Sequence, residues 1–336
     1  MELIKCKAFA RAGLIGNPSD GYNGKTISFV VGDYYAEAIL YEWERVEIVP
    51  SQEDQSRFDS INDLVRDVEL HGYYGGIRLV KATLKRFVDY CRRHNLALHD
   101  RNFSIRYFSN IPRQVGMAGS SAIIIAVLRA LMEFYQVDIP IEVQPSLVLS
   151  IETDEIGIRG GLQDRVIQVY NGLVYMDFAK EKMVEQKGYT HGEYERLDPN
   201  LLSNVYVAYS TAVGEPTEVF HNPLWMRYNQ GDQQVVSAMD QFAGFAADAR
   251  TALMNQDHPR LHELLDANFD LRRAISPLSP DHVRMIETAR SAGGSAKYAG
   301  SGGAIVGTFP DDSVYQQLRE KLGAIGCHVF RPAIVG

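Results

Sequence analysis

The 336-residue sequence is short of cysteine, of long hydrophobic runs and of surplus positive charge. Its three cysteines, Cys6, Cys91 and Cys327, are far apart and have no CxxC spacing, which excludes a disulfide framework and a zinc knuckle. The most apolar run, residues 122–128, is far too short for a membrane span, and the charged N-terminus lacks the apolar core of a signal peptide. Because 34 Lys and Arg face 42 Asp and Glu, general nucleic-acid binding is not expected. These absences predict a soluble, cytoplasmic protein.

The residues that are present predict an α+β fold of two domains. Hydrophobic residues make up 46% of the chain and charged residues 23%, which is enough apolar material for a substantial core. The polar stretch 179–200 marks an approximate boundary, so we predict an N-terminal domain over residues 1–190 and a C-terminal domain over 200–336. Residues 120–135 form a helical pattern that is apolar almost all round, which is typical of a helix in the middle of a fold.

Local patterns predict the other elements. Residues 27–31 and 36–40 suggest a hairpin with Gly32 and Asp33 in its turn, and residues 51–60 suggest a loop. Further strands are expected over 46–49, 103–107, 205–210, 304–309 and 328–334, and further helices over 78–92, 166–170, 233–254, 260–272, 280–292 and 312–322.

A glycine- and serine-containing loop precedes the apolar helix. In residues 111–122, IPRQVGMAGSSA, Gly116 and Gly119 allow a tight bend and a close approach to a ligand. Ser120 and Ser121 then open the helix, whose first amides form an anion site, while the hydroxyls can reach a phosphate or Mg²⁺. A capping serine after a glycine turn explains this segment equally well.

A second glycine-rich loop lies near the C-terminus. Residues 292–304, AGGSAKYAGSGGA, contain five glycines, and two such loops fit a nucleotide phosphate held from two sides. The GKT at 24–26 is not the end of a Walker A loop, because position 19 is serine, and no G-x-G-x-x-G follows a strand.

Carboxylates gather between residues 152 and 164. Phosphoryl transfer needs a carboxylate for Mg²⁺ and often a second to orient the acceptor hydroxyl, roles open to Glu152 and Asp164. Helix capping by Asp164 and a solvated position for Glu152 are the structural alternatives. Asp20 ends the turn NPSD, either as ordinary turn chemistry or to accept hydrogen bonds from sugar hydroxyls. The nine histidines form no metal-binding cluster.

Three motifs in this order resemble those of the GHMP small-molecule kinase superfamily: RAGLIGNPSD at 11–20, PRQVGMAGSSA at 112–122 and GGSAKYAGSGGA at 293–304. The resemblance implies an N-terminal domain like ribosomal protein S5 domain 2 and a ferredoxin-like C-terminal domain. The segments GYYGGIRL at 72–79 and GLQDRVIQVYNGLVYMDF at 161–178 are similar to those of the glucuronokinase family. That family implies ATP-dependent phosphorylation of the anomeric hydroxyl of D-glucuronate. A kinase for another sugar and a sensor of sugar and nucleotide without turnover remain as alternatives.

The resemblance also implies roles for individual residues. It makes Asp164 the catalytic aspartate with Arg11 beside it, Ser121 and Glu152 the Mg²⁺ ligands, and Asp20 a sugar ligand. It places the ATP phosphates against Gly116, Met117, Ala118, Gly119, Ser120, Ser121, Lys297, Gly300, Ser301 and Gly302. A sugar acid needs a cation for its carboxylate, for which the sequence offers Arg11, Lys25, Arg113 and Arg159.

Three positions depart from what these relatives lead us to expect. Asn17-Pro18 stands where galactokinases have Glu-His, which speaks against galactose. Met117-Ala118 replaces the commoner Leu-Gly or Leu-Ser, a change the loop is expected to absorb. Arg159 replaces an apolar residue.

Overall fold

The computed structural model describes residues 3–50, 54, 75–158, 160–211 and 218–336. Its strands are β1 (Leu3–Ile15), β2 (Lys25–Trp43), β3 (Glu47–Val49), β4 (Asn102–Ser109), β5 (Leu173–Asp177), β6 (Val184–Gln186), β7 (Tyr189–His191), β8 (Glu193–Leu197), β9 (Val205–Ser210), β10 (Lys297–Tyr298), β11 (Ala304–Thr308) and β12 (Cys327–Phe330). Its α-helices are α2 (Gly76–Arg93), α3 (Gly119–Tyr135), α4 (Gln144–Ser150), α5 (Gln163–Tyr170), α6 (Glu218–Asn229), α7 (Gln233–Met254), α8 (His258–Ile275), α9 (Pro280–Ser291) and α10 (Asp312–Ala324). A short turn of 3-10 helix, η1 (Ser19–Tyr22), follows β1, and a π-helical turn, η3 (Ile151–Ile156), follows α4.

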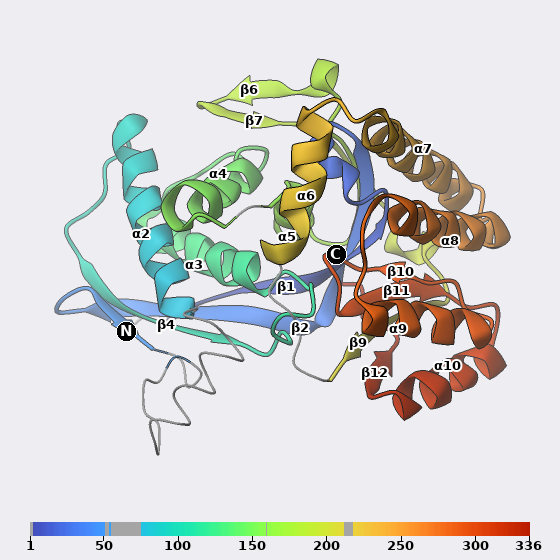
Figure 1. Cartoon of the computed structure of the whole chain (residues 1–336). Coiled ribbons are helices and arrows are strands. Elements are labelled where there is room, and N and C mark those ends of the chain that lie inside the picture. Colours follow the sequence, from blue (N-terminus) through green and yellow to red (C-terminus); the bar gives the residue numbers. More distant parts are fainter. Residues whose placement is uncertain (1–2, 51–53, 55–74, 159, 212–217) are drawn as a thin grey trace, which may run out of the picture.

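The first sheet has the order β3-β4-β2-β5-β8, with β1 paired to β2. All its pairings are antiparallel except that of β3 with β4. Helices α2, α3, α4 and α5 lie over one face of this sheet (Figure 1). This layer of helices carries the expected phosphate loop at the start of α3 and Asp164 at the start of α5.

The expected hairpin at 27–40 is wrong, because β2 runs without a turn through Gly32 and Asp33. The register of β1 against β2 shifts there, so that Phe9 faces Tyr35 while Ala10 faces Val31. Gly32 N–H donates to the carbonyl of Ala333 at 2.7 Å, and the Asp33 carboxylate accepts from the Ala333 amide. The C-terminal segment thus supplies hydrogen-bond partners to the irregular part of a long strand. The local sequence of that part has turn chemistry, which alone would suggest a hairpin.

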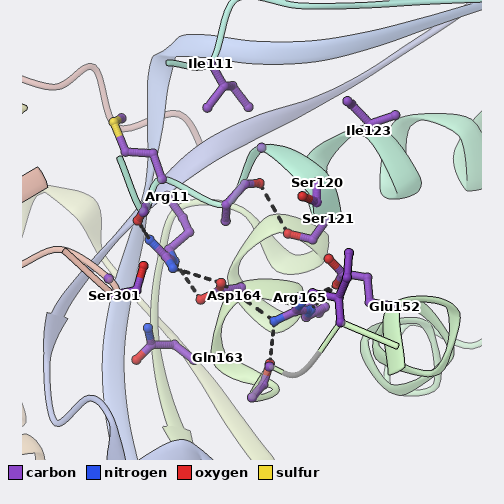
Figure 2. Close-up of a pocket in the computed structure, with 18 of the residues that line it drawn as sticks. Arg11, Ile111, Ser120, Ser121, Ile123, Glu152, Gln163, Asp164, Arg165 and Ser301 are labelled. Carbon is purple, nitrogen blue, oxygen red and sulfur yellow. Dashed lines mark hydrogen bonds and ion pairs between the residues drawn. The ribbon is translucent and has the colours of Figure 1, made fainter. Parts of the chain in front are cut away.

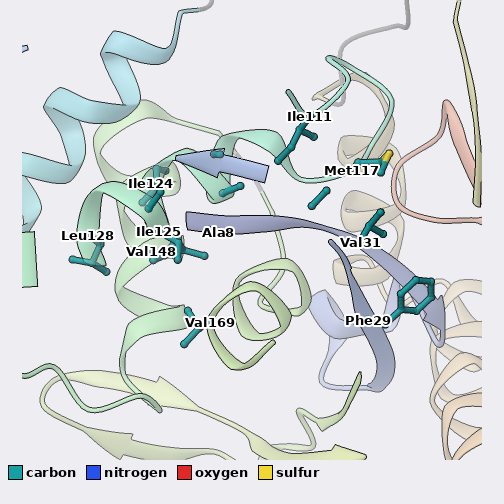
Figure 3. Close-up of a cluster of buried hydrophobic side chains, with 14 of the residues drawn as sticks. Ala8, Phe29, Val31, Ile111, Met117, Ile124, Ile125, Leu128, Val148 and Val169 are labelled. Atoms are coloured by element: carbon teal, nitrogen blue, oxygen red, sulfur yellow. The ribbon is translucent and has the colours of Figure 1, made fainter. Parts of the chain in front are cut away.

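Helix α3 is the centre of the N-terminal core, as its apolar pattern predicts. Ile124, Ile125 and Leu128 are buried in one hydrophobic cluster that also contains Ala8 of β1 and Phe29 of β2 (Figure 3). Burying a side chain of this size stabilises the fold by about 1.5–3 kcal/mol. The packing fixes the helix, and with it the loop that precedes the helix.

The second sheet has the order β10-β11-β9-β12 and is antiparallel. Helix α7 contacts β2, and α8 contacts β1, β10 and β11, while α9 packs on β11 and α10 on β12; all four helices lie on the right of Figure 1. The expected strands and helices of this half are present, except that β12 ends at Phe330 and that α6 was not expected. The boundary near residues 190–200 stays a prediction.

Within the described part of the chain, no helix is long and apolar enough to cross a bilayer. The loop expected at 51–60 lies outside the described residues, apart from Asp54.

Candidate active site

The two glycine-rich loops lie against each other, although 186 positions separate the contacting residues Gly116 and Gly302 in the sequence. A Cβ on Gly116 would lie 2.7 Å from the carbonyl oxygen of Gly302, and one on Gly300 would lie 2.3 Å from the carbonyl oxygen of Gly116. Only glycine permits this approach, and Gly116 also has a left-handed φ of 71°. Ala118 has a φ of 62°, so the loop accommodates the alanine in a backbone conformation that favours glycine.

Arg11, on β1, joins both loops to the carboxylate of Asp164. Its Nε donates to Oδ1 of Asp164 at 2.7 Å, and its Nη2 donates to Oδ2 at 2.8 Å. Nη1 donates to the carbonyls of Gly116 and Ala299, one from each glycine-rich loop. Arg11 is 4% exposed. A buried, two-pronged ion pair of this geometry fixes the orientation of the carboxylate.

Asp164 stands in the first turn of α5, three residues after Gly161. Its side chain is 21% exposed and lines a cavity, so one carboxylate surface is open to a ligand although both oxygens bind Arg11. Figure 2 shows Arg11 and Asp164 facing each other, with Ser301 beside Arg11. The structure therefore brings the two expected catalytic residues together.

Ser121 and Glu152, the expected Mg²⁺ ligands, both line the same cavity. The Ser121 hydroxyl donates to Oε1 of Gln168 at 2.6 Å, which places its proton away from a cation and leaves its lone pairs available. Glu152 is 1% exposed and accepts hydrogen bonds from Arg165, from Nε at 2.7 Å and from Nη2. No group of three His, Cys, Asp or Glu side chains that could hold a metal occurs among the described residues. The pair therefore suits Mg²⁺ that takes its other ligands from phosphates and water.

Asp20 lies beneath the turn that leads to Asp164. Its Oδ2 accepts from the amide of Gln163 at 3.3 Å, and a Cβ on Gly161 would lie only 1.9 Å from that oxygen. Burial raises the pKa of Asp20 to about 6, and the charge of Asp164 contributes in the same direction. Asp164, which is paired with Arg11, and Asp20, whose pKa is raised, thus lie close together.

The cavity has a volume of about 740 Å³, within the range of sites for small ligands. Of the expected site residues it is lined by Arg11, Asp20, Arg113, Gly116, Met117, Ala118, Gly119, Ser120, Ser121, Glu152, Asp164, Gly300 and Ser301. Arg159 lies outside the described residues.

Lys25, Lys297 and Gly302 are not among the lining residues. Lys25 pairs with Asp177 at 3.2 Å. Lys297 is 1% exposed and donates to the carbonyls of Gly13 and Tyr298 at 2.7 and 2.6 Å. Burial lowers the pKa of Lys297 well below its ordinary value, and Arg272 and Arg11 add to the effect. The Lys297 ammonium thus joins β1 to β10 in the interior, and the roles expected of Lys25, Lys297 and Gly302 stay predictions.

Sequence reasoning missed two buried arginines that line the cavity, Arg165 and Arg272. Arg165 follows Asp164 directly, and its pairing with Glu152 could have been suspected from two opposite charges in one polar segment. Arg272 stands beside Arg273 in the last turn of α8, where basic residues are ordinary and carry no signal of function.

The sequence is similar to family models and to proteins of known function. The model "GHMP kinases N terminal domain" matches residues 78–172, and "GHMP kinases C terminal" matches residues 249–326. The chain is 44% identical to probable glucuronokinase 2 of Arabidopsis thaliana, a match that covers 94% of this chain and 87% of the relative. It is 42% identical to glucuronokinase 1 of the same plant, over 95% of this chain and 88% of the relative.

A solved structure also shares the fold. The crystal structure of Streptococcus pneumoniae phosphomevalonate kinase matches all of this chain and all of its own with a TM-score of 0.75 at 14% identity. Together with the two matched models, this similarity confirms the expected two-domain α+β architecture.

Proposed function

The chain belongs to the GHMP kinase family, and from that premise we propose that it is a glucuronokinase, which transfers the γ-phosphoryl group of ATP to the anomeric hydroxyl of D-glucuronate. The activity on glucuronate is supported by the identity of 42–44% to the two plant glucuronokinases over nearly the whole chain. The anomeric position and the residue roles below are our proposal.

The observation that carries the proposal is the pairing of Arg11 with Asp164 where the two glycine-rich loops meet. In the transfer, the anomeric oxygen forms a bond to the γ-phosphorus while the bond from that phosphorus to the bridging oxygen of ADP breaks. Asp164 orients the anomeric hydroxyl and accepts its proton. Arg11 holds the Asp164 carboxylate in place and charged, so that most of the acceleration comes from positioning and electrostatics.

The triphosphate lies, in this proposal, along the loop of residues 116–121 and the start of α3. The first amides of a helix have no partners within it and attract an anion, and α3 begins at Gly119. Gly300 and Ser301 close the site from the other side. Arg78 and Arg113 line the cavity from α2 and from the segment before the loop, where their charge suits the nucleotide.

Ser121 and Glu152 would hold Mg²⁺ in this arrangement, which would supply positive charge against the transferring phosphoryl group. Gln168 fixes the Ser121 hydroxyl with its oxygen lone pairs free, and Arg165 fixes the Glu152 carboxylate.

A coupled ADP-release assay tests the function. The purified chain receives ATP and Mg²⁺ with glucuronate, galacturonate, glucose, galactose or a heptose phosphate. We expect kcat/KM to be highest for glucuronate, and we expect Asp164→Asn to lose at least 100-fold while keeping the wild-type affinity for ATP. A preference for another sugar, or near-normal turnover by a folded Asp164→Asn variant, contradicts the proposal.

A further inference from the structure

A uronic acid differs from a neutral sugar by its C6 carboxylate, which the proposed function requires the site to recognise. In a pyranose ring, C1 and C5 both flank the ring oxygen, so the carboxylate on C5 lies on the same edge of the sugar as the reacting hydroxyl. A cation that binds it must therefore line the same cavity as Asp164 and must have hydrogen-bond donors to spare. Guanidinium, with its planar fork of donors, fits a carboxylate best.

Four of the five arginines of the described cavity wall are engaged or assigned to another ligand. Arg11 donates hydrogen bonds to the Asp164 carboxylate and to two loop carbonyls. Arg165 binds Glu152 and the carbonyl of Gly161. Arg78 and Arg113 are exposed and come from the segments that we assign to the nucleotide. Arg272 is left.

Arg272 is buried yet unpartnered in the described part of the chain. Its side chain lines the cavity and the residue is only 3% exposed. Neither Nε nor Nη1 has a hydrogen-bond partner there, and no ion pair among the described residues involves it. Its Cζ lies over the ring of Tyr298, 5.7 Å from the ring centroid. A buried guanidinium with unmet donors is costly, and such a group in a cavity wall is explained by an anionic ligand.

Hydrogen bonds made by Asn268 hold helix α8, which carries Arg272, against the turn that follows β1. Asn268, one turn earlier on the same face, accepts from the amide of Gly16 at 2.8 Å and donates to the carbonyl of Asn17 at 3.3 Å. These two buried bonds tie α8 to the turn that carries Asp20. The charge of Asp20 in turn supports the protonated form of Arg272, which burial opposes.

Unmet acceptors line the same cavity. Oδ1 of Asn17 and Oε1 of Gln163 are buried and have no hydrogen-bond partner within the described residues. Gln163 precedes Asp164, and Asn17 lies in the turn that Asn268 holds. Donors that suit a carboxylate and acceptors that suit hydroxyls are thus presented to one ligand, which is the pattern of a sugar acid.

We propose that Arg272 binds the C6 carboxylate of the sugar acid, while Asn17 and Gln163 accept hydrogen bonds from its hydroxyls. The inference rests on the proposed function. The alternative is that Arg272 merely balances the charge of Asp20. The two can be told apart, because only an Arg272 that binds the sugar carboxylate makes the loss of affinity on replacing Arg272 depend on the charge of the sugar.

The test compares glucuronate with glucuronamide, its neutral amide, by calorimetric binding to the full chain saturated with Mg²⁺ and a non-hydrolysable ATP analogue. Arg272→Gln should weaken glucuronate at least 30-fold and glucuronamide less than threefold. Arg272→Lys, which keeps the charge but loses the fork, should fall between wild type and Arg272→Gln. Arg273→Gln is the matched control, since Arg273 is the exposed neighbour that pairs with Glu287.

Each other outcome has a separate meaning. Equal losses for both sugars in Arg272→Gln overturn the inference and favour the support of Asp20. Wild-type affinity for glucuronate in that variant also overturns it. If Arg272→Gln does not fold, Arg272→Lys decides, because an unchanged ratio of the two affinities then refutes carboxylate binding. A wild-type chain that phosphorylates another sugar and binds no glucuronate contradicts the proposed function instead.

Discussion

Replacing Gly161 with alanine should disable sugar binding without unfolding the protein. An ideal Cβ there lies 1.9 Å from Oδ2 of Asp20, whereas real Cβ contacts almost never fall under 3.0 Å. The Asp20 carboxylate, or the turn that leads to Asp164, must therefore move by about 1.1 Å. Displacements near 1 Å in a catalytic arrangement cost about 100-fold in rate, which corresponds to about 2.7 kcal/mol of transition-state stabilisation.

The assay is steady-state kinetics with glucuronate and with ATP varied separately. Gly161→Ala should lower kcat/KM for glucuronate about 100-fold and leave ATP binding, measured without sugar, within twofold. Gly21→Ala is the matched control, because Gly21 also lines the cavity next to Asp20 but a Cβ there meets nothing within 4 Å. If Gly161→Ala keeps kcat/KM for glucuronate within threefold of wild type, Asp20 and this turn do not position the sugar.

Four further predictions concern charge and stability. Because the pKa of Asp20 is raised from 3.8 to about 6, its carboxylate ionises, and so becomes an acceptor for the sugar hydroxyls, as the pH rises through 6. The value of kcat/KM for glucuronate should therefore increase over this range, and Asp20→Asn should remove the increase. The same shift makes the contribution of Asp20 to stability largest below about pH 4 and lost as the pH rises through 6, so urea unfolding of Asp20→Asn should lack this pH dependence. Glu152→Gln removes the nearer of the two carboxylates that pair with the buried Arg165, leaving Asp164 at 3.7 Å, and should cost about 3–5 kcal/mol in urea unfolding; a loss under 1 kcal/mol would mean that Asp164 alone balances the charge of Arg165. Gly244→Ala, exposed within α7 with open space for a Cβ, should stabilise the protein by about 0.5–1 kcal/mol, and a destabilised variant would contradict the packing described for α7.

Much of the fold could be predicted because its signals are local. Helix α3 combines a glycine turn, two serines and an apolar run, and α7 begins and ends at the residues that its periodicity indicates. The hairpin failed for the opposite reason. Gly32 and Asp33 have turn chemistry, but their partner is Ala333, and a contact across 300 positions leaves no local signal.

The site divides in the same way. Asp164, Arg11 and Asp20 could be named because they belong to motifs whose residue types carry the chemistry. Arg272 and Arg273 are indistinguishable in the sequence, and only the packing of α8 makes one buried and the other exposed. Lys297 is a case where the motif predicts a phosphate ligand and the structure shows a side chain whose ammonium donates to backbone carbonyls in the core, so its expected role stays a prediction.

Phosphorus NMR of the reaction with glucuronate tests the central claim most directly, because it identifies which oxygen receives the phosphoryl group. The account predicts one sugar phosphate whose phosphorus couples to the anomeric proton, formed by wild type and at least 100-fold more slowly by Asp164→Asn. A phosphate on any other oxygen, or an anomeric phosphate formed equally fast without the Asp164 carboxylate, would contradict it.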